Sequence, residues 1–123
     1  MAHISQETQS CISECLNCHG VCLETIAHCL QMGGKHAEAV HIALLQDCAQ
    51  ICITSADFML RGSQYHGQTC GVCAAVCEAC AQSCDQLSEG GANDFMARCA
   101  EACRRCAKSC RQMAGSMSSS ASM

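Results

Sequence analysis

The stretch CAEACRRCAKSC, residues 99–110, decides the fold of this chain because its four cysteines follow one another at steps of four, three and four. Residues at these steps share one face of an α-helix, so the four thiols form a stripe along about three turns. The same Cys-x3-Cys-x2-Cys-x3-Cys spacing occurs at residues 11–22 (CISECLNCHGVC) and 73–84 (CAAVCEACAQSC). Three helices are therefore predicted to carry a row of thiols on a single face.

The remaining cysteines extend two of these stripes and place a shorter one on another segment. Cys29 extends the stripe of the N-terminal motif by seven residues, and Cys70 extends that of the middle motif by three. Cys48 and Cys52 are four residues apart on a segment of their own. All sixteen cysteines are therefore expected on inward stripes: Cys11, Cys15, Cys18, Cys22, Cys29, Cys48, Cys52, Cys70, Cys73, Cys77, Cys80, Cys84, Cys99, Cys103, Cys106 and Cys110.

Glycines divide the chain into four segments of similar length, and the chain has no proline. Gly33-Gly34, Gly62 and Gly90-Gly91 each follow an apolar-periodic segment, where glycine is the usual signal for a helix end. Near-equal helices joined by short loops favour an all-α, antiparallel up-down four-helix bundle with a cysteine-lined core. The helices are expected at about 5–31, 36–61, 65–89 and 93–114.

The length of 123 residues suits a single domain, which we place at 1–114. The segment 115–123 is small, polar and rich in serine, and we predict that it is disordered. No Trp, one Tyr and two Phe leave cysteine and alanine to fill much of the core. Free cysteine suits that place because it behaves as a small hydrophobic residue.

The charge pattern and the ends of the chain argue against several kinds of partner. A net charge of −4 without a basic, aromatic face predicts no nucleic-acid binding. Arg104, Arg105, Lys108 and Arg111 are interpreted as the solvated face of the last helix. We see neither a secretory signal nor a membrane-spanning stretch, so we expect a cytoplasmic protein. In a reducing compartment, clustered cysteines indicate metal sites more than disulfides.

Thiols four residues apart on a helix can hold one ion between two sulfur atoms, because their Cβ atoms lie about 5–6 Å apart. Cu(I) prefers soft sulfur ligands, and one monovalent ion per thiolate would neutralise the core at a loading on the order of 16 Cu(I) per chain. Zn²⁺ prefers four tetrahedral ligands, so the same thiols would hold only about four zinc ions. The sequence therefore favours Cu(I), with multiple ions per chain.

Other readings of the cysteines stay open at this point. A zinc or general heavy-metal thiolate buffer is the main rival. A disulfide-based redox protein is a second alternative, although thiols on one helix are poorly aimed for a disulfide bond. The cysteine ligands of iron–sulfur clusters usually lie on loops, so cysteines on helices disfavour an iron–sulfur protein. We find no catalytic constellation and expect no enzymatic activity.

Histidines and methionines are expected at the two ends of the bundle. His41 lies seven residues before Cys48, on the same stripe, and is the best candidate for a non-cysteine ligand. An antiparallel arrangement brings it to the same end as Cys29, Cys84 and Cys99. The end near His41 is also expected to gather His28, Met32, His36 and Met96, and the opposite end Met59, His66 and Met113. His19, next to Cys18, is expected off the stripe.

Four segments with inward Cys-x3-Cys and Cys-x2-Cys stripes resemble the bacterial copper storage proteins, over about residues 5–114. The resemblance is closest to the cytosolic branch of that family. It implies a bundle that is largely preformed without metal, many Cu(I) ions held by the sixteen cysteines, and a homotetramer. The second segment carries only Cys48 and Cys52, so the number of ions that the chain binds stays open.

Overall fold

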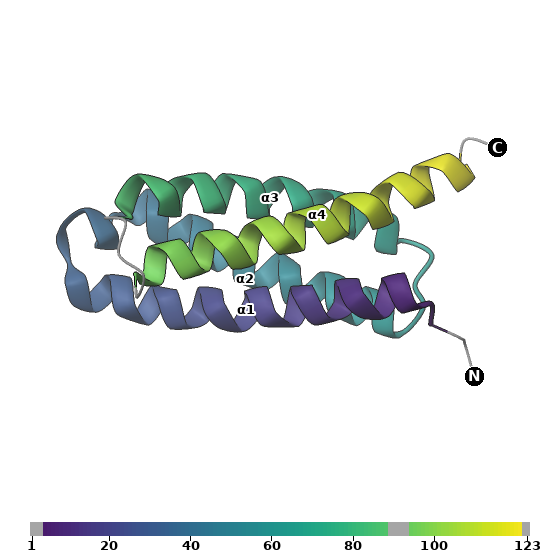
Figure 1. Ribbon diagram of the computed structural model, residues 1–123, viewed down its shortest axis with the longest axis horizontal. Coiled ribbons are helices and arrows are strands. Elements are labelled where there is room, and N and C mark those ends of the chain that lie inside the picture. Colours follow the sequence, from purple (N-terminus) through teal and green to yellow (C-terminus); the bar gives the residue numbers. More distant parts are fainter. Residues whose placement is uncertain (1–3, 89–93, 122–123) are drawn as a thin grey trace.

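The computed structural model describes residues 4–88 and 94–121 of the chain, with side chains up to residue 115. The described residues form four long helices and one short 3-10 helix (Figure 1). The elements are α1 (Gln6–Met32), η1 (Gly34–Ala37), α2 (Ala39–Leu60), α3 (His66–Leu87) and α4 (Phe95–Ala121).

The four helices form an antiparallel up-down bundle, as predicted. Each helix packs against two others, so that α1 lies beside α2 and α4, and α3 lies beside the same two. Successive helices run in opposite directions, and α1 begins at the same end of the bundle at which α4 finishes (Figure 1). This arrangement turns one face of each helix towards a common axis.

The helices begin and end close to the predicted positions, with one difference in length. α4 continues to Ala121, beyond the predicted end at 114 and into the Ser-rich segment for which the sequence predicts disorder. The glycine pair at 90–91 lies outside the described residues. The single domain at 1–114 stays a prediction, and α4 extends beyond its predicted boundary.

Local hydrogen bonds and glycines set the helix ends. The Ser5 hydroxyl accepts a hydrogen bond from the Thr8 amide at 3.1 Å and so caps the start of α1. The Asp94 carboxylate accepts one from the Met96 amide at 2.8 Å at the start of α4. Gly33 and Gly62, with φ of 71° and 67°, take the left-handed conformation that ends α1 and follows α2.

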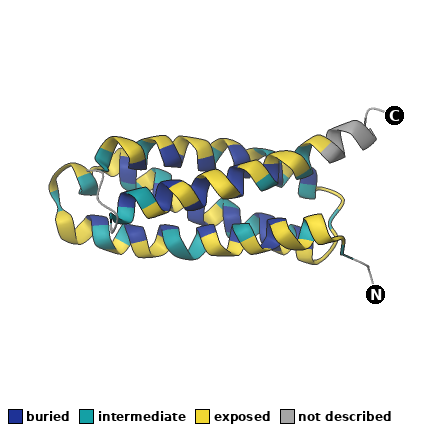
Figure 2. Ribbon diagram, in the orientation of Figure 1, coloured by how far each residue is buried: buried dark blue, intermediate teal, exposed yellow. Residues whose placement is uncertain are grey.

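Thiols occupy the axis of the bundle. All sixteen cysteines are buried, and none is more than 1% exposed. Alanines such as Ala49, Ala74 and Ala100 pack beside them, and Leu45 and Met96 are the largest fully buried side chains. Figure 2 shows the buried residues as bands on the inward side of each helix. Such small side chains let the helices approach closely and bring the sulfur atoms of different helices into contact.

α2 is the most apolar of the helices. By length and composition alone it could cross a membrane, a test that the core helices of soluble proteins also pass. Here it packs between α1 and α3, with Leu45, Cys48 and Cys52 fully buried and Val40 82% exposed. α2 is thus one wall of the bundle.

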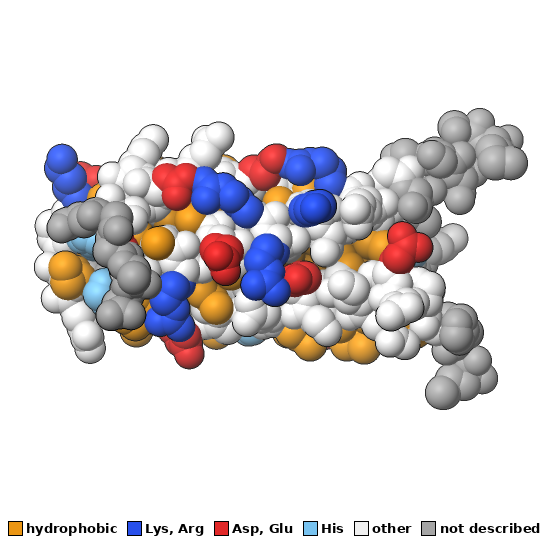
Figure 3. All heavy atoms as spheres, in the orientation of Figure 1, with side chains coloured by type: hydrophobic (Ala, Val, Ile, Leu, Met, Phe, Trp, Pro, Cys, Tyr) orange, Lys and Arg blue, Asp and Glu red, His pale blue; other side chains and the backbone are white. Residues whose placement is uncertain are grey.

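Ion pairs hold α4 against its neighbours on the solvent side (Figure 3). Arg104 pairs with Asp85 and Arg111 with Glu78, both on α3, while Arg105 lies 3.3 Å from Glu14 on α1. Exposed pairs of this kind stabilise a protein by roughly 0–1 kcal/mol each. Arg104, Arg105 and Arg111 therefore lie on a solvated, ion-paired face of α4.

Candidate metal-binding core

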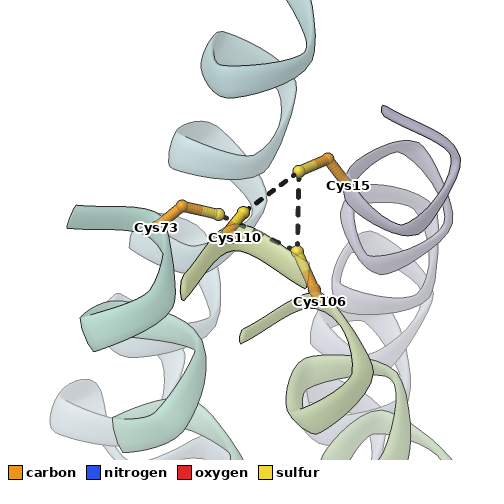
Figure 4. Close-up of side chains that lie close together, drawn as sticks. All are labelled: Cys15, Cys73, Cys106 and Cys110. Carbon is orange, nitrogen blue, oxygen red and sulfur yellow. Dashed lines mark hydrogen bonds between the residues drawn. The ribbon is translucent and has the colours of Figure 1, made fainter. Parts of the chain in front are cut away.

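Near one end of the bundle, four thiols from three helices meet (Figure 4). The Cys15 sulfur on α1 lies 3.5 Å from that of Cys110 and 3.6 Å from that of Cys106, both on α4. Cys106 is in turn 3.8 Å from Cys73 on α3. All four sulfur atoms lie within 4.8 Å of one another, so they form one potential site.

The middle of the bundle repeats this arrangement with a contribution from α2. The Cys48 sulfur lies 3.6 Å from Cys77 on α3, 3.8 Å from Cys103 on α4 and 3.9 Å from Cys18 on α1. Cys52, one turn further along α2, contacts Cys73 and Cys77 at 3.7 Å each. Here every helix of the bundle offers at least one thiol.

The four-thiol groups overlap, because a sulfur of one group also belongs to the next. Cys18 and Cys48 are shared by the group with Cys52 and Cys77 and the group with Cys22 and Cys103. Cys22 and Cys103 are shared in turn with the group that contains Cys80 and Cys99. Five of the groups formed by the described residues are Cys15/Cys73/Cys106/Cys110, Cys52/Cys73/Cys77/Cys106, Cys18/Cys48/Cys52/Cys77, Cys18/Cys22/Cys48/Cys103 and Cys22/Cys80/Cys99/Cys103. An ion held in one group is therefore within reach of thiols of the next.

The sulfur separations suit metal bridging with little movement. With metal–sulfur bonds near 2.3 Å, two sulfurs on one ion lie about 4.0 Å apart in trigonal and about 4.6 Å apart in linear coordination. The contacts between neighbouring thiols are 3.5–4.0 Å long. All sixteen cysteines are free thiols, which gives no support to the disulfide reading.

Burial and mutual hydrogen bonding set the protonation of these thiols. Burial raises the pKa of Cys29 to about 11. A hydrogen bond with Cys11 raises the pKa of Cys70 to about 12. Within the column the shifts alternate: hydrogen bonds, chiefly with Cys103, lower the pKa of Cys48, whereas those with Cys18, Cys22 and Cys48 raise the pKa of Cys103. The thiols thus share protons, and a metal ion must displace the protons that they hold.

His41 lies at the end of the bundle, where the sequence places it. Its Nε2 is 3.5 Å from the Cys29 sulfur, and its Nδ1 is 2.7 Å from the Ser83 hydroxyl on α3. The Met96 sulfur is 3.9 Å from Cys29. Cys29, His41 and Met96 come from three helices, and we call them the terminal site. Burial lowers the pKa of His41, which favours the neutral imidazole that binds metals.

Of the other histidines and methionines that the sequence places at the two ends, few contact a thiol in the described part of the chain. His28 stacks on Phe95 at 4.3 Å and lies 6.2 Å from the His36 ring. At the opposite end Met59 lies 3.8 Å from Cys70. His66 instead bonds the Ser63 carbonyl.

Two hydrogen bonds of histidine side chains could not be predicted from the sequence patterns. Ser83 orients His41 across the helix interface, and nothing in the spacing of α3 marks it. The His19 Nδ1 bonds the Ala49 carbonyl at 2.8 Å, outside the thiol stripe as predicted but partly buried against α2. Both contacts depend on how neighbouring helices are aligned, which sequence periodicity does not reveal.

A four-helix bundle whose axis is a column of free thiols defines a class of cysteine-lined metal-binding proteins. The family described as copper storage protein matches residues 4–115. This chain belongs to the copper storage protein family.

Solved structures agree with this assignment. The chain is similar to the Nmul_A1745 protein from Nitrosospira multiformis, with 48% identity and a TM-score of 0.82 over 89% of this chain and 96% of that one. Cu(I)-bound copper storage protein BsCsp3 is 32% identical, with a TM-score of 0.80 over 89% of this chain and 99% of that one.

The chain is also similar in sequence to a cysteine-rich protein of Bacillus subtilis. The uncharacterized cysteine-rich protein YhjQ of Bacillus subtilis (strain 168) is 32% identical over 73 residues, which cover 59% of this chain and 68% of that protein.

Proposed function

We propose that this chain stores Cu(I) on the thiolates of its core, without catalysis. The observation that carries the proposal is the series of overlapping, fully buried groups of four thiols, each with sulfur atoms within 4.8 Å of one another. Membership of the copper storage protein family and the similarity to Cu(I)-bound BsCsp3 support copper as the stored ion.

The balance of charge in the core favours a monovalent ion. Buried thiolates without counter-ions are costly, because burying an unpaired charge raises the free energy of the folded state by several kcal/mol or more. One Cu⁺ per thiolate leaves the column neutral, whereas Zn²⁺ with four thiolates leaves each site with a charge of about −2. We therefore favour Cu(I) over the zinc-buffer alternative.

Titration of the reduced, metal-free protein with Cu(I) under anaerobic conditions tests the proposal. We expect saturation at on the order of 16 ions per chain, against about four for Zn²⁺ in a parallel titration. A competing chelator of known affinity gives both the end point and the strength of binding. Saturation with Cu(I) near four ions, or tighter binding of Zn²⁺, would contradict copper storage.

All sixteen cysteines and His41 are proposed as ligands. His41 takes this role with Cys29 and Met96, because the Cys29 sulfur lies 3.5 Å from His41 Nε2 and 3.9 Å from the Met96 sulfur. Together they offer one nitrogen and two sulfurs. Imidazole and thioether are ligands that copper accepts beside thiolate. The hydrogen bond between His41 Nδ1 and the Ser83 hydroxyl holds the ring so that Nε2 faces Cys29.

We propose that the protein acts in the cytoplasm. All sixteen cysteines are free thiols, and many neighbouring pairs have sulfur atoms 3.5–4.0 Å apart. Such thiols persist where the thiol pool is reducing, and in a compartment that forms disulfides they would be open to oxidation.

We also propose that the chain is a homo-oligomer, a tetramer in line with its resemblance to the family. Leu16, Leu23 and Leu30 repeat every seven residues on the outside of α1 and are 43–57% exposed. A heptad of leucines keeps one side of a helix apolar and suits packing against a second copy of itself. His19 lies between the first two leucines and contacts α2, so this apolar stripe adjoins the apolar wall of the bundle.

Replacement of two of these leucines by glutamate is expected to break the oligomer. Leu16→Glu with Leu23→Glu would place like charges opposite each other in a self-association and should reduce the mass in solution to that of a smaller species, by light scattering. Val72→Glu, on α3 and 53% exposed, is the matched control. An unchanged mass for the leucine variant would contradict this interface.

A further inference from the structure

One level of the bundle has no sulfur on two of its four helices. On α1, Thr25 lies between Cys22 and Cys29 and is fully buried. Its hydroxyl donates to the carbonyl of Val21 at 2.7 Å, so it is engaged with its own helix. On α2, Leu45 lies between His41 and Cys48 and is also fully buried.

The antiparallel register of α1 and α2 places Thr25 and Leu45 at about the same level of the bundle. Cys29 on α1 contacts His41 on α2, and about two to three turns further into the bundle Cys18 contacts Cys48. Because α1 and α2 run in opposite directions, Thr25, four residues before Cys29, and Leu45, four residues after His41, each lie about one turn further into the bundle than the contact between Cys29 and His41. An aliphatic side chain and a hydroxyl bonded to its own backbone give Cu(I) no soft ligand. The α1–α2 side of the bundle is therefore closed to a thiol-bound ion at this level.

This level separates the terminal site from the thiol column. Cys29 contacts His41 and Met96, while its interactions with Cys99 and Cys80 are electrostatic. On the α3–α4 side of the bundle, thiols are present along this part of the core. Cys80 and Cys99 belong to a four-thiol group with Cys22 and Cys103, and hydrogen bonds with Cys80 and Cys99 raise the pKa of Cys84.

We propose that Leu45, with Thr25, confines copper exchange between the terminal site and the column to a single route through Cys84 and Cys99. Leu45 binds no ion in this proposal. Its side chain blocks the path that a copper ion would otherwise take along the α1–α2 side of the core. This inference rests on the proposed storage function and adds a direction to the movement of the ion within the core.

Each step along this route is a ligand exchange with no change of oxidation state. A Cu–S bond to the incoming sulfur forms while a Cu–S bond to the outgoing sulfur breaks, and the ion stays Cu(I). The proton of the incoming thiol passes to the sulfur that is released. Neighbouring sulfurs within about 4 Å let a bridged state connect the two. Across the Leu45 level on the α1–α2 side, no such bridged state is available.

The test measures how fast Cu(I) fills the reduced protein in a stopped-flow experiment that follows thiolate-to-copper absorption. Cys84→Ala with Cys99→Ala removes the route, and Cys11→Ala with Cys70→Ala removes the same number of thiols from the opposite end. We expect the first variant to fill at least about tenfold more slowly than the second, which corresponds to a barrier higher by about 1.4 kcal/mol. Adding Leu45→Cys to the first variant should restore the rate, because it supplies a sulfur on the closed side.

Each outcome decides the matter. Equal rates for the two double variants, or slower filling of the Cys11/Cys70 variant, would overturn the proposed route. Failure of Leu45→Cys to restore the rate, in a variant whose helical circular dichroism is unchanged, would overturn the role of Leu45. Equilibrium Cu(I) capacity is measured for every variant: a wild-type capacity near four ions would refute storage itself, whereas normal capacity with equal rates would refute the route alone.

Discussion

The reduced protein loaded with Cu(I) is expected to unfold at a temperature tens of degrees above that of the metal-free protein. Within one four-thiol group, Cys18, Cys48 and Cys103 come from three different helices, so an ion bound there ties those helices together. A ligand present at about a thousand times its dissociation constant stabilises the folded state by about 4 kcal/mol per site. For a domain of this size each kcal/mol raises the unfolding midpoint by a few degrees, so even a few occupied sites give a large shift.

Circular dichroism at 222 nm, recorded during heating, measures this shift. The metal-free chain should already be helical, because the four helices pack through small apolar side chains and thiols. Removal of copper with a chelator, followed by a second melt, should return the midpoint to its metal-free value. A random-coil spectrum without metal, or a midpoint that copper leaves unchanged, would contradict a preformed core that binds its ions between helices.

Acidification is expected to release the stored copper. The pKa of Cys29 is raised to about 11 and that of Cys70 to about 12, so both thiols hold their protons at neutral pH and a copper ion must displace them. As pH falls, protons compete more strongly for the sulfurs. If about one proton returns for each ion released, apparent affinity drops about tenfold per pH unit, and between pH 7.5 and 5.5 by roughly a hundredfold.

Competition with a chelator, corrected for its own protonation at each pH, measures this effect. An affinity independent of pH over this interval would show that the thiols carry no protons for copper to displace. The metal-free bundle should respond in the opposite sense. The stability that comes from the raised pKa of Cys29 is present below pH 9.0 and is lost as pH rises through about 11, because the unfolded chain gives up that proton first.

Much of this architecture could be predicted because cysteine spacing carries two kinds of information. Steps of three and four residues identify a helix and also identify its inward face. Gly33 and Gly62 mark helix ends because only glycine takes their positive φ easily. The same patterns place His41 at one end of the core, where its imidazole contacts Cys29.

The parts that the sequence does not reveal depend on how helices align with one another. Periodicity shows that Cys48 faces inward, but the pairing of Cys48 with Cys77 and Cys103 depends on the relative shift of three helices. The Leu45 level is hidden for the same reason, since Thr25, at about the same level on α1, is twenty residues away in the chain. The extension of α4 to Ala121 has no helix-favouring signal in its serine-rich sequence.

The placement of the chain ends has a practical consequence for anyone who attaches this protein to something else. α1 begins, and α4 finishes, at the end of the bundle remote from His41 (Figure 1). A surface, a fluorescent label or a second domain joined at either terminus would thus stand some 30 Å away from the terminal site, given the rise of about 1.5 Å per helical residue. Copies tethered to a surface by either terminus would all be oriented with the terminal site facing away from that surface.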